Sequence, residues 1–214
     1  MTSLMGVTPD LRLARMLSVA SIALVACRPS GGQGLVDAGA VQVSPSPPAS
    51  APPTLYAGPG AVPYLQLLAR GTQNYTCLFA DGGGAAWGPA VPEATLYDPD
   101  GGTVGRHFGG PTWEWTADQS SFVGSKVVAD GFASIPSPDD AGVDVPWLLL
   151  PRKVGTDAGM LGPAIFVQRL KTEGGVVTNQ PSSCDAVAAD GGRTVKVPYR
   201  ATYVFYRSMG RSTG

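Results

Sequence analysis

Apolar and polar residues alternate with a period of two along much of the chain beyond residue 70. Residues 199–206 are the clearest case, with Tyr199, Ala201, Tyr203 and Phe205 on one face and Arg200, Thr202, Val204 and Tyr206 on the other. This alternation is typical of a β-strand whose two faces meet different surroundings. The run WLLL at residues 147–150, enclosed by two prolines, instead predicts a strand buried on both faces.

Glycine, proline and aspartate divide these apolar runs into short segments. Turn signals stand at residues 99–102, 130–131, 174–175 and 190–192. The strands predicted between them lie near residues 72–79, 93–98, 103–108, 112–116, 122–129, 146–150, 164–170 and 195–206. Only residues 62–69 suggest a short helix. We therefore predict an all-β fold, a β-sandwich of about eight short and mostly antiparallel strands, with a closed β-barrel as the alternative.

The first 26 residues have a different pattern. Arg12 and Arg15 precede an apolar run that ends in Leu-Val-Ala before Cys27, which resembles a bacterial lipobox. The run is shorter than the roughly 20 residues that a membrane-spanning helix needs. Residues 1–26 are therefore predicted to be a lipoprotein signal peptide, after which Cys27 receives a lipid. The alternatives are a signal peptide in which Cys27 is incidental, and a buried helix.

The predicted lipid on Cys27 would hold the protein in the cell envelope, outside the cytoplasm. Arg28 follows the cysteine in place of the aspartate that retains many lipoproteins in an inner membrane, so we expect the outer membrane. Residues 27–54 are rich in Pro, Ala, Ser and Gly and predict a disordered linker. Residues 55–210 are expected to form a single all-β domain, followed by a disordered tail at residues 211–214.

Charge and cysteine content narrow the range of partners. The formal net charge is −1 and no stretch is strongly basic, which argues against nucleic acid as a partner. With Cys27 lipidated, Cys77 and Cys184 remain in an oxidising compartment and are predicted to form a disulfide. Two separate buried thiols are the alternative.

Several motifs along the predicted domain resemble those of one known family. They are GTQNYTC at residues 71–77, VGRHFGGPTWE at residues 104–114, PWLLL at residues 146–150, QRLKTEGG at residues 168–175, Cys184, and VPYRATYVFY at residues 197–206. Their order is similar to that of the family known as domain of unknown function 3455 (DUF3455). The resemblance implies an extracytoplasmic domain found in bacteria and fungi, and no activity. Two departures are Gln119, where the family more often has glycine, and an insertion at residues 136–144.

The most suggestive chemistry lies in residues 107–114, which contain the only histidine of the chain. His107 and Glu114 are the catalytic candidates, because an imidazole with a carboxylate partner can exchange protons near neutral pH. His107, Trp113 and Glu114 are the candidates for ligand binding. In the simpler interpretation, His107 hydrogen-bonds to a loop backbone and the Gly-Gly-Pro segment turns the chain. One histidine makes a multi-histidine metal site impossible, and we predict no metal and no cofactor.

The four tryptophans, Trp87, Trp113, Trp115 and Trp147, raise the question of carbohydrate binding, because exposed indoles stack on sugars. Trp113 and Trp115 fall on one strand face, and burial is the favoured interpretation for both. Trp147 is expected in the core. No Gly-x-Ser-x-Gly nucleophile motif is present.

Two functional hypotheses follow. The first is a lipid-anchored binding or scaffolding module of the cell envelope, whose ligand is a glycan, a small molecule or a surface protein. The second is an extracytoplasmic hydrolase or isomerase that uses His107 and Glu114. They are separated by asking whether His107, Trp113 and Glu114 converge on one concave surface.

Overall fold

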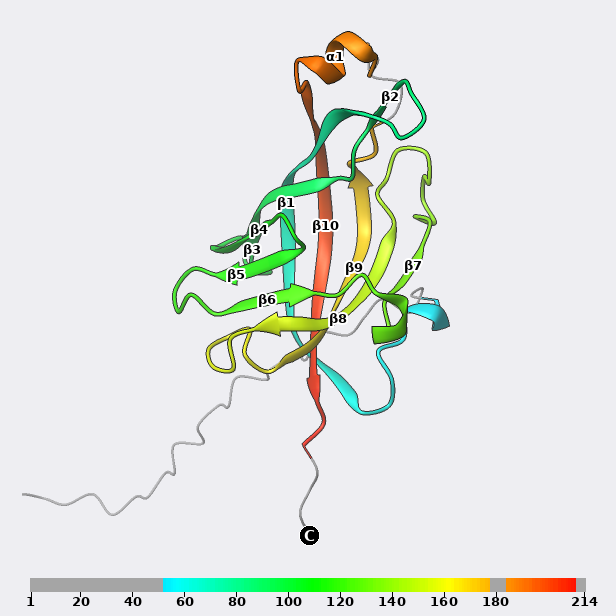
Figure 1. Cartoon of the computed structure of the whole chain (residues 1–214). Helices are drawn as coiled ribbons and strands as arrows, with labels where there is room; N and C mark the ends of the chain where they lie inside the picture. The colour runs from blue at the N-terminus through cyan, green and yellow to red at the C-terminus, as the bar shows by residue number, and fades with distance from the viewer. Residues whose placement is uncertain (1–51, 178–183, 211–214) are drawn as a thin grey trace, which may run out of the picture. The chain divides into compact units, whose positions relative to one another are not determined.

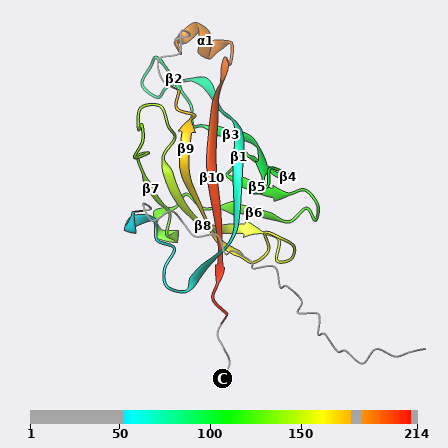
Figure 2. The ribbon, with the colours of Figure 1, turned by 180° about the vertical axis from the view of Figure 1, so that it is seen from behind.

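Two long strands, β1 (Ala61–Phe79) and β10 (Thr194–Ser208), run antiparallel through the length of the fold (Figure 1). The computed structural model describes residues 52–177 and 184–210. The predicted signal peptide, Cys27, most of the predicted linker and the predicted tail lie outside the described residues. In the long ladder Ala61 faces Ser208 at one end and Thr76 faces Thr194 at the other. The view from behind shows the two strands side by side (Figure 2).

The other elements are short. In chain order they are η1 (Pro53–Leu55), β2 (Ala85–Trp87), β3 (Val91–Tyr97), β4 (Thr103–Phe108), β5 (Thr112–Trp115), β6 (Ser121–Gly124), η2 (Val128–Asp130), β7 (Ala133–Ile135), β8 (Trp147–Gly155), β9 (Ala164–Gly174) and α1 (Ala186–Asp190).

The strand pairings form a closed ring. They run from β1 through β3, β4, β5, β6, β8, β9 and β10, and β10 pairs again with β1. These pairings are all antiparallel. Two short strands lie outside the ring, where β2 pairs antiparallel with the end of β1 and β7 pairs antiparallel with the start of β8. The structure confirms the predicted all-β, antiparallel fold. The return of the pairing from β10 to β1 is the feature that the closed alternative requires.

Two apolar clusters lie on opposite faces of the strands. The inner cluster draws residues from strands all around the ring, among them Leu67, Leu96, Trp113, Phe122, Leu150, Val167 and Phe205. The outer cluster contains Leu55, Trp147, Leu149, Leu170, Val204 and Tyr206, with η1 and β7 packed over it. Burial of each such large side chain stabilises the fold by about 1.5–3 kcal/mol. Strands β8 and β10 are therefore buried on both faces, which confirms the prediction for residues 147–150.

The sequence-based boundaries fail in three places. Residues 62–69 are part of β1, and the helix predicted there is wrong, because the segment pairs with β10 and buries Leu67 and Ala69 on one face. The strand predicted at residues 122–129 ends at Gly124, after which the chain turns and Ser125 Oγ donates to Asp130 at 2.6 Å. Strands β2 and β7 were not predicted, because three residues are too few to show alternation.

The predicted disulfide is present. Cys77 at the end of β1 is bonded to Cys184, with 5.4 Å between the two Cα atoms. Asp185 caps α1, since its carboxylate accepts a hydrogen bond from Ala188 N. The bridge therefore ties α1 and the start of β10 to the far end of β1.

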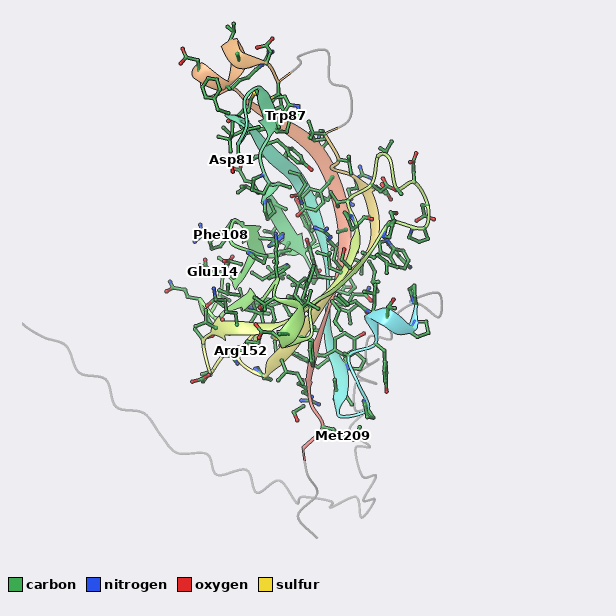
Figure 3. The ribbon with its side chains drawn as sticks, turned by 45° about the vertical axis from the view of Figure 1, so that its right-hand side comes forward. Asp81, Trp87, Phe108, Glu114, Arg152 and Met209 are labelled. Atoms are coloured by element: carbon green, nitrogen blue, oxygen red, sulfur yellow. A yellow bond between two sulfur atoms is a disulfide. The ribbon has the colours of Figure 1, made fainter. Side chains whose placement is uncertain are left out.

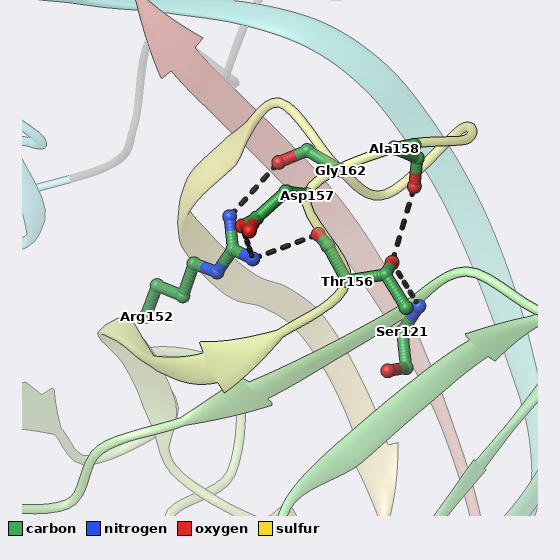
Figure 4. A network of polar contacts seen from close by, with 6 residues as sticks. All are labelled: Ser121, Arg152, Thr156, Asp157, Ala158 and Gly162. Atoms are coloured by element: carbon green, nitrogen blue, oxygen red, sulfur yellow. Dashed lines mark hydrogen bonds and ion pairs between the residues drawn. The ribbon is translucent and has the colours of Figure 1, made fainter.

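The loop at residues 156–162, between β8 and β9, buries Leu161 in the inner cluster at one end of the ring, which we call the closed end. Figure 4 shows the polar contacts of this loop. Arg152 donates to Gly162 O at 2.9 Å and to Thr156 O at 2.7 Å, and it pairs with Asp157 at 3.0 Å. Thr156 Oγ1 accepts from Ser121 N and donates to Ala158 O. These contacts hold the loop in place across strands β6 and β8.

Leu161 is the residue of this loop that packs into the apolar interior of the ring. Its side chain is fully buried in the inner cluster, and its backbone N–H donates to Ser120 Oγ at 3.0 Å. Asp118 accepts hydrogen bonds from the N–H groups of Ser120 and Met160. Between Asp118 and Ser120, Gln119 has a φ of 57°, a conformation that favours glycine. The departure from the family pattern noted in the sequence thus falls on a strained position.

Candidate functional site

The opposite end of the ring contains a cavity of about 240 Å³, and we call it the cavity end. It is lined by strands β1, β3, β4, β5, β8, β9 and β10 and by the loops around residues 90, 110, 126, 132 and 145. Its polar and aromatic lining includes Gln73, His107, Trp113, Lys126, Arg169 and Tyr203. A ring of eight strands encloses space for side chains or for one small ligand. This ring has both, at opposite ends.

Aromatic rings form the floor of the cavity. His107 stacks on Trp113 with ring centroids 4.1 Å apart and 10° between the planes, and Tyr203 meets the His107 ring edge-on at 5.2 Å. Trp113 also makes edge contacts with Phe122 and Phe205. The register places His107 on β4 directly opposite Trp113 on β5, so both side chains enter the ring from neighbouring strands. These contacts place a cluster of packed aromatic rings along one side of the cavity.

His107 is neutral in this environment. Its side chain is buried, and Nδ1 donates to the carbonyl oxygen of Thr112 at 2.8 Å. Burial lowers its pKa from 6.5 to about 3, against the opposing effect of the Thr112 carbonyl. Because Nδ1 carries the proton, Nε2 is the unprotonated nitrogen. The contact with Thr112 is the backbone hydrogen bond that the simpler interpretation of the sequence expected.

Glu114 lies on the other face of the sheet (Figure 3). It is bonded to Arg106, which stands opposite it on β4, at 3.0 Å from Nε to Oε1 and 3.2 Å from Nη2 to Oε2. A strand places successive side chains on opposite faces, so the inward position of Trp113 directs Glu114 outward. The structure thus brings His107 and Trp113 together and separates both from Glu114.

Two cations that sequence reasoning missed line the cavity. Arg169 on β9 is half-buried and shares the inward face with Val167, and its Nε donates to Pro146 O at 2.9 Å. Lys126 follows β6 at the mouth. Desolvation lowers the pKa of Lys126, and the nearby charge of Arg169 lowers it further. Among the described residues that line the cavity, none carries a carboxylate. The sequence could have indicated this position of Arg169, because the alternation in residues 164–170 places Arg169 on the same strand face as Val167, which is in the core.

Several buried hydrogen-bond donors at this end have no partner within the described part of the chain. They are Gln73 Nε2, Trp113 Nε1, Tyr199 Oη and Tyr203 Oη. Burial raises the pKa of both tyrosines, so their hydroxyl groups stay protonated. The two hydroxyls interact with each other, and that of Tyr203 interacts with Arg169, although none of these contacts has the geometry of a full hydrogen bond. Each unpaired buried donor costs about 1–3 kcal/mol, a cost that a bound acceptor would remove.

The tryptophans do not combine into an exposed platform. Trp113 and Trp147 are buried in the inner and outer clusters, which confirms the core position predicted for Trp147. Trp115 is half-buried against the inner cluster on the same face as Trp113. Trp87 lies apart from the others, on β2 (Figure 3).

In residues 52–177 and 184–210, no three or more His, Cys, Asp or Glu side chains are grouped to hold a metal ion. None of the helices described there is long and apolar enough to cross a membrane.

Comparison with known proteins gives one match. The family model described as a protein of unknown function (DUF3455) matches residues 59–207, from just before β1 to nearly the end of β10. No curated protein and no solved structure matches the chain.

Proposed function

The chain belongs to the DUF3455 family, and because that membership assigns no activity, we propose from the cavity that the domain binds a small organic molecule. The observation that carries the proposal is the contrast inside the ring. One end is filled by Leu161 and its hydrogen-bonded loop, while the other holds a lined cavity with unpaired donors. Ligand sites of this kind combine apolar and aromatic walls with a few polar groups that set orientation.

The size of the cavity favours a small molecule over the other ligands considered. About 240 Å³ lies between a cavity of about 150 Å³ that holds benzene and the pockets of about 300 Å³ and above that hold drug-sized ligands. A glycan chain or a surface protein would need an extended exposed surface. The aromatic rings of His107 and Trp113 instead line an enclosed space.

The alternative of a hydrolase or isomerase lacks a supporting observation. A general base must reach its partner within hydrogen-bonding distance or through one water. His107 faces the interior, while Glu114 faces outward and is paired with Arg106. The low pKa of His107 also removes its buffering near neutral pH.

The location of the protein belongs to the same proposal. A lipid on Cys27 would hold the binding domain outside the cytoplasm, and the disulfide between Cys77 and Cys184 supports an oxidising compartment. Radiolabelled fatty acid should enter the wild-type protein in cells and should not enter a Cys27→Ala variant. Equal labelling of the two proteins would contradict the anchor and leave the cavity proposal standing.

Binding is tested with a library of one-ring and two-ring compounds and the full chain, by ligand-detected NMR and calorimetry. Ala90 lines the cavity, so Ala90→Trp should fill its mouth and weaken the hits roughly tenfold or more. Ala86, exposed on β2, offers the matched control Ala86→Trp, which should leave binding unchanged. An absence of hits, or hits that bind both variants equally, would overturn the proposal.

A further inference from the structure

We propose that the ligand is a small planar anion, a carboxylate on one or two unsaturated rings, whose charge is held by Arg169 and Lys126. The inference rests on the proposed small-molecule function and adds the chemical class of the ligand. It is carried by three independent features of the cavity, namely its uncompensated positive charge, its unpaired donors and its aromatic lining.

The positive charge stands out when the two half-buried arginines are compared. Arg152 at the closed end pairs with Asp157 and also donates to two backbone carbonyls. Arg169 at the cavity end donates a hydrogen bond to Pro146 O and interacts with the Tyr203 hydroxyl, and it has no ion pair with a described residue. A partly desolvated guanidinium without a counter-charge is unfavourable. A bound carboxylate would supply that counter-charge in a geometry that matches the guanidinium fork.

Lys126 adds a second positive charge to the same cavity. Lys126 is exposed and lines the same cavity as Arg169, so the two like charges repel each other, which contributes to the lowered pKa of Lys126. None of the described residues that line the cavity carries a carboxylate, and Glu114 and Glu173 pair instead with Arg106 and Arg200. An anion between Arg169 and Lys126 would replace this repulsion with two attractions.

The donors point to the same ligand. Gln73 Nε2, Trp113 Nε1 and Tyr203 Oη are buried donors at or beside the cavity, and a carboxylate is a pure acceptor with two oxygens. A neutral alcohol or amide would satisfy fewer of them and would leave the charge of Arg169 uncompensated. A ligand cation would meet two like charges and is disfavoured.

The aromatic side chains that line the cavity favour a planar ring as the apolar part of the ligand. His107 and Trp113 line the cavity as a stacked pair of rings, and aromatic side chains favour a planar ring as their partner. At about 240 Å³ the cavity exceeds the roughly 150 Å³ that accommodates one benzene ring and approaches the size for two fused rings. Naphthoate is therefore a suitable probe, and naphthamide is its neutral counterpart of nearly the same shape.

The test measures the affinity of the full chain for naphthoate and for naphthamide by calorimetry. Naphthoate should bind roughly tenfold or more tightly than naphthamide, and Arg169→Met and Lys126→Met should each weaken naphthoate roughly tenfold. Arg200→Met and Lys153→Met remove exposed cations away from the cavity and should leave both affinities unchanged. Thermal unfolding of each variant shows whether it is folded, and if Arg169→Met is not, Lys126→Met decides alone.

The outcomes separate this inference from the proposed function. If naphthamide binds as tightly as naphthoate and Ala90→Trp weakens both, the ligand is not selected as an anion, and small-molecule binding stands. If Lys126→Met leaves the affinity for naphthoate unchanged, the charge argument is also overturned. If neither probe binds and the library yields no hit that Ala90→Trp weakens, both the inference and the proposed function are overturned.

Discussion

The closed end and the cavity end of the ring use the same strands in opposite ways. At the closed end, Leu161 fills the interior and the polar groups of the loop bond to one another around Arg152. At the cavity end, Arg169 keeps one carbonyl partner, and the donors of Gln73 and Tyr203 have none among the described residues. The polar groups of the loop at the closed end are hydrogen-bonded, whereas several donors at the cavity end have no partner among the described residues.

This difference indicates that the closed end contributes to stability and that the cavity end suits ligand binding. Buried polar groups that are fully bonded make a structure rigid, while unpaired ones cost stability, a cost that a bound ligand can remove. The loop at residues 156–162 serves the first purpose. The cavity near Arg169 suits ligand binding.

The largest expected effect comes from the disulfide beyond the cavity end. Replacing Cys77 and Cys184 by alanine releases a loop of 107 residues and should lower the free energy of unfolding by about 4–5 kcal/mol, less any native strain. Urea unfolding measures the loss, and wild-type protein in reductant should match the variant. Hydrogen exchange should rise in α1 and the adjoining end of β1 before it rises at the closed end. A loss spread evenly over both ends would contradict this comparison.

Leu161→Ala should destabilise the protein by about 3 kcal/mol, because a fully buried leucine leaves a void that its neighbours fill only in part. The matched variant at the other end is Leu148→Ala, since Leu148 is half-buried and already borders the cavity. It should cost less than half as much in urea unfolding. Equal losses would show that the two ends are packed alike.

His107 should make stability depend on pH. Its folded pKa of about 3 lies below the unfolded value of 6.5, so the unfolded chain binds the extra proton between these values. Stability should therefore fall as pH drops below 6.5, by about 1.4 kcal/mol per pH unit from this residue. Urea unfolding across this range compares wild type with His107→Gln, which lacks the effect. Identical pH slopes would mean that the imidazole is not held neutral.

The two half-buried arginines sharpen the comparison further. Arg152→Met should cost about 2 kcal/mol, because it removes an ion pair and leaves the carbonyls of Thr156 and Gly162 without their donor. Arg169→Met loses one hydrogen bond and also the repulsion with Lys126, so its thermal midpoint should stay close to that of the wild type. A larger loss for Arg169→Met would reverse the roles assigned to the two ends.

The smallest effect is a gain at the closed end. Gln119 has a φ of 57°, so Gln119→Gly should relieve strain and stabilise the protein by about 0.5–1 kcal/mol. Gln119→Ala should bring no such gain, because alanine also has a Cβ. The difference in thermal midpoint between these two variants is the measurement. No difference between glycine and alanine would argue against a strained turn.

Much of the fold could be predicted because it depends on local pattern. The predicted segment at residues 103–108 coincides with β4, and the Asp-Gly-Gly turn before it closes as expected, with Gly101 at a φ of 89°. The helix predicted at residues 62–69 failed because propensity and short-range pattern say nothing about the partner strand β10, more than a hundred residues away. For the candidate site, His107 and Trp113 were found, while Arg169 and Gln73 were not.

The sequence by itself determined the all-β character, the main turns and the cysteine pair, because alternation, turn chemistry and cysteine count can be read along the chain. Only the tertiary structure decided that β10 returns to β1, and that His107 faces the cavity while Glu114 faces outward. The physical reason is the pairing of strands that lie far apart in the sequence. The short turn at residues 109–111 sets the pairing of β4 with β5 locally, but only the pairing of distant strands into the ring decides which face of that hairpin lies inside.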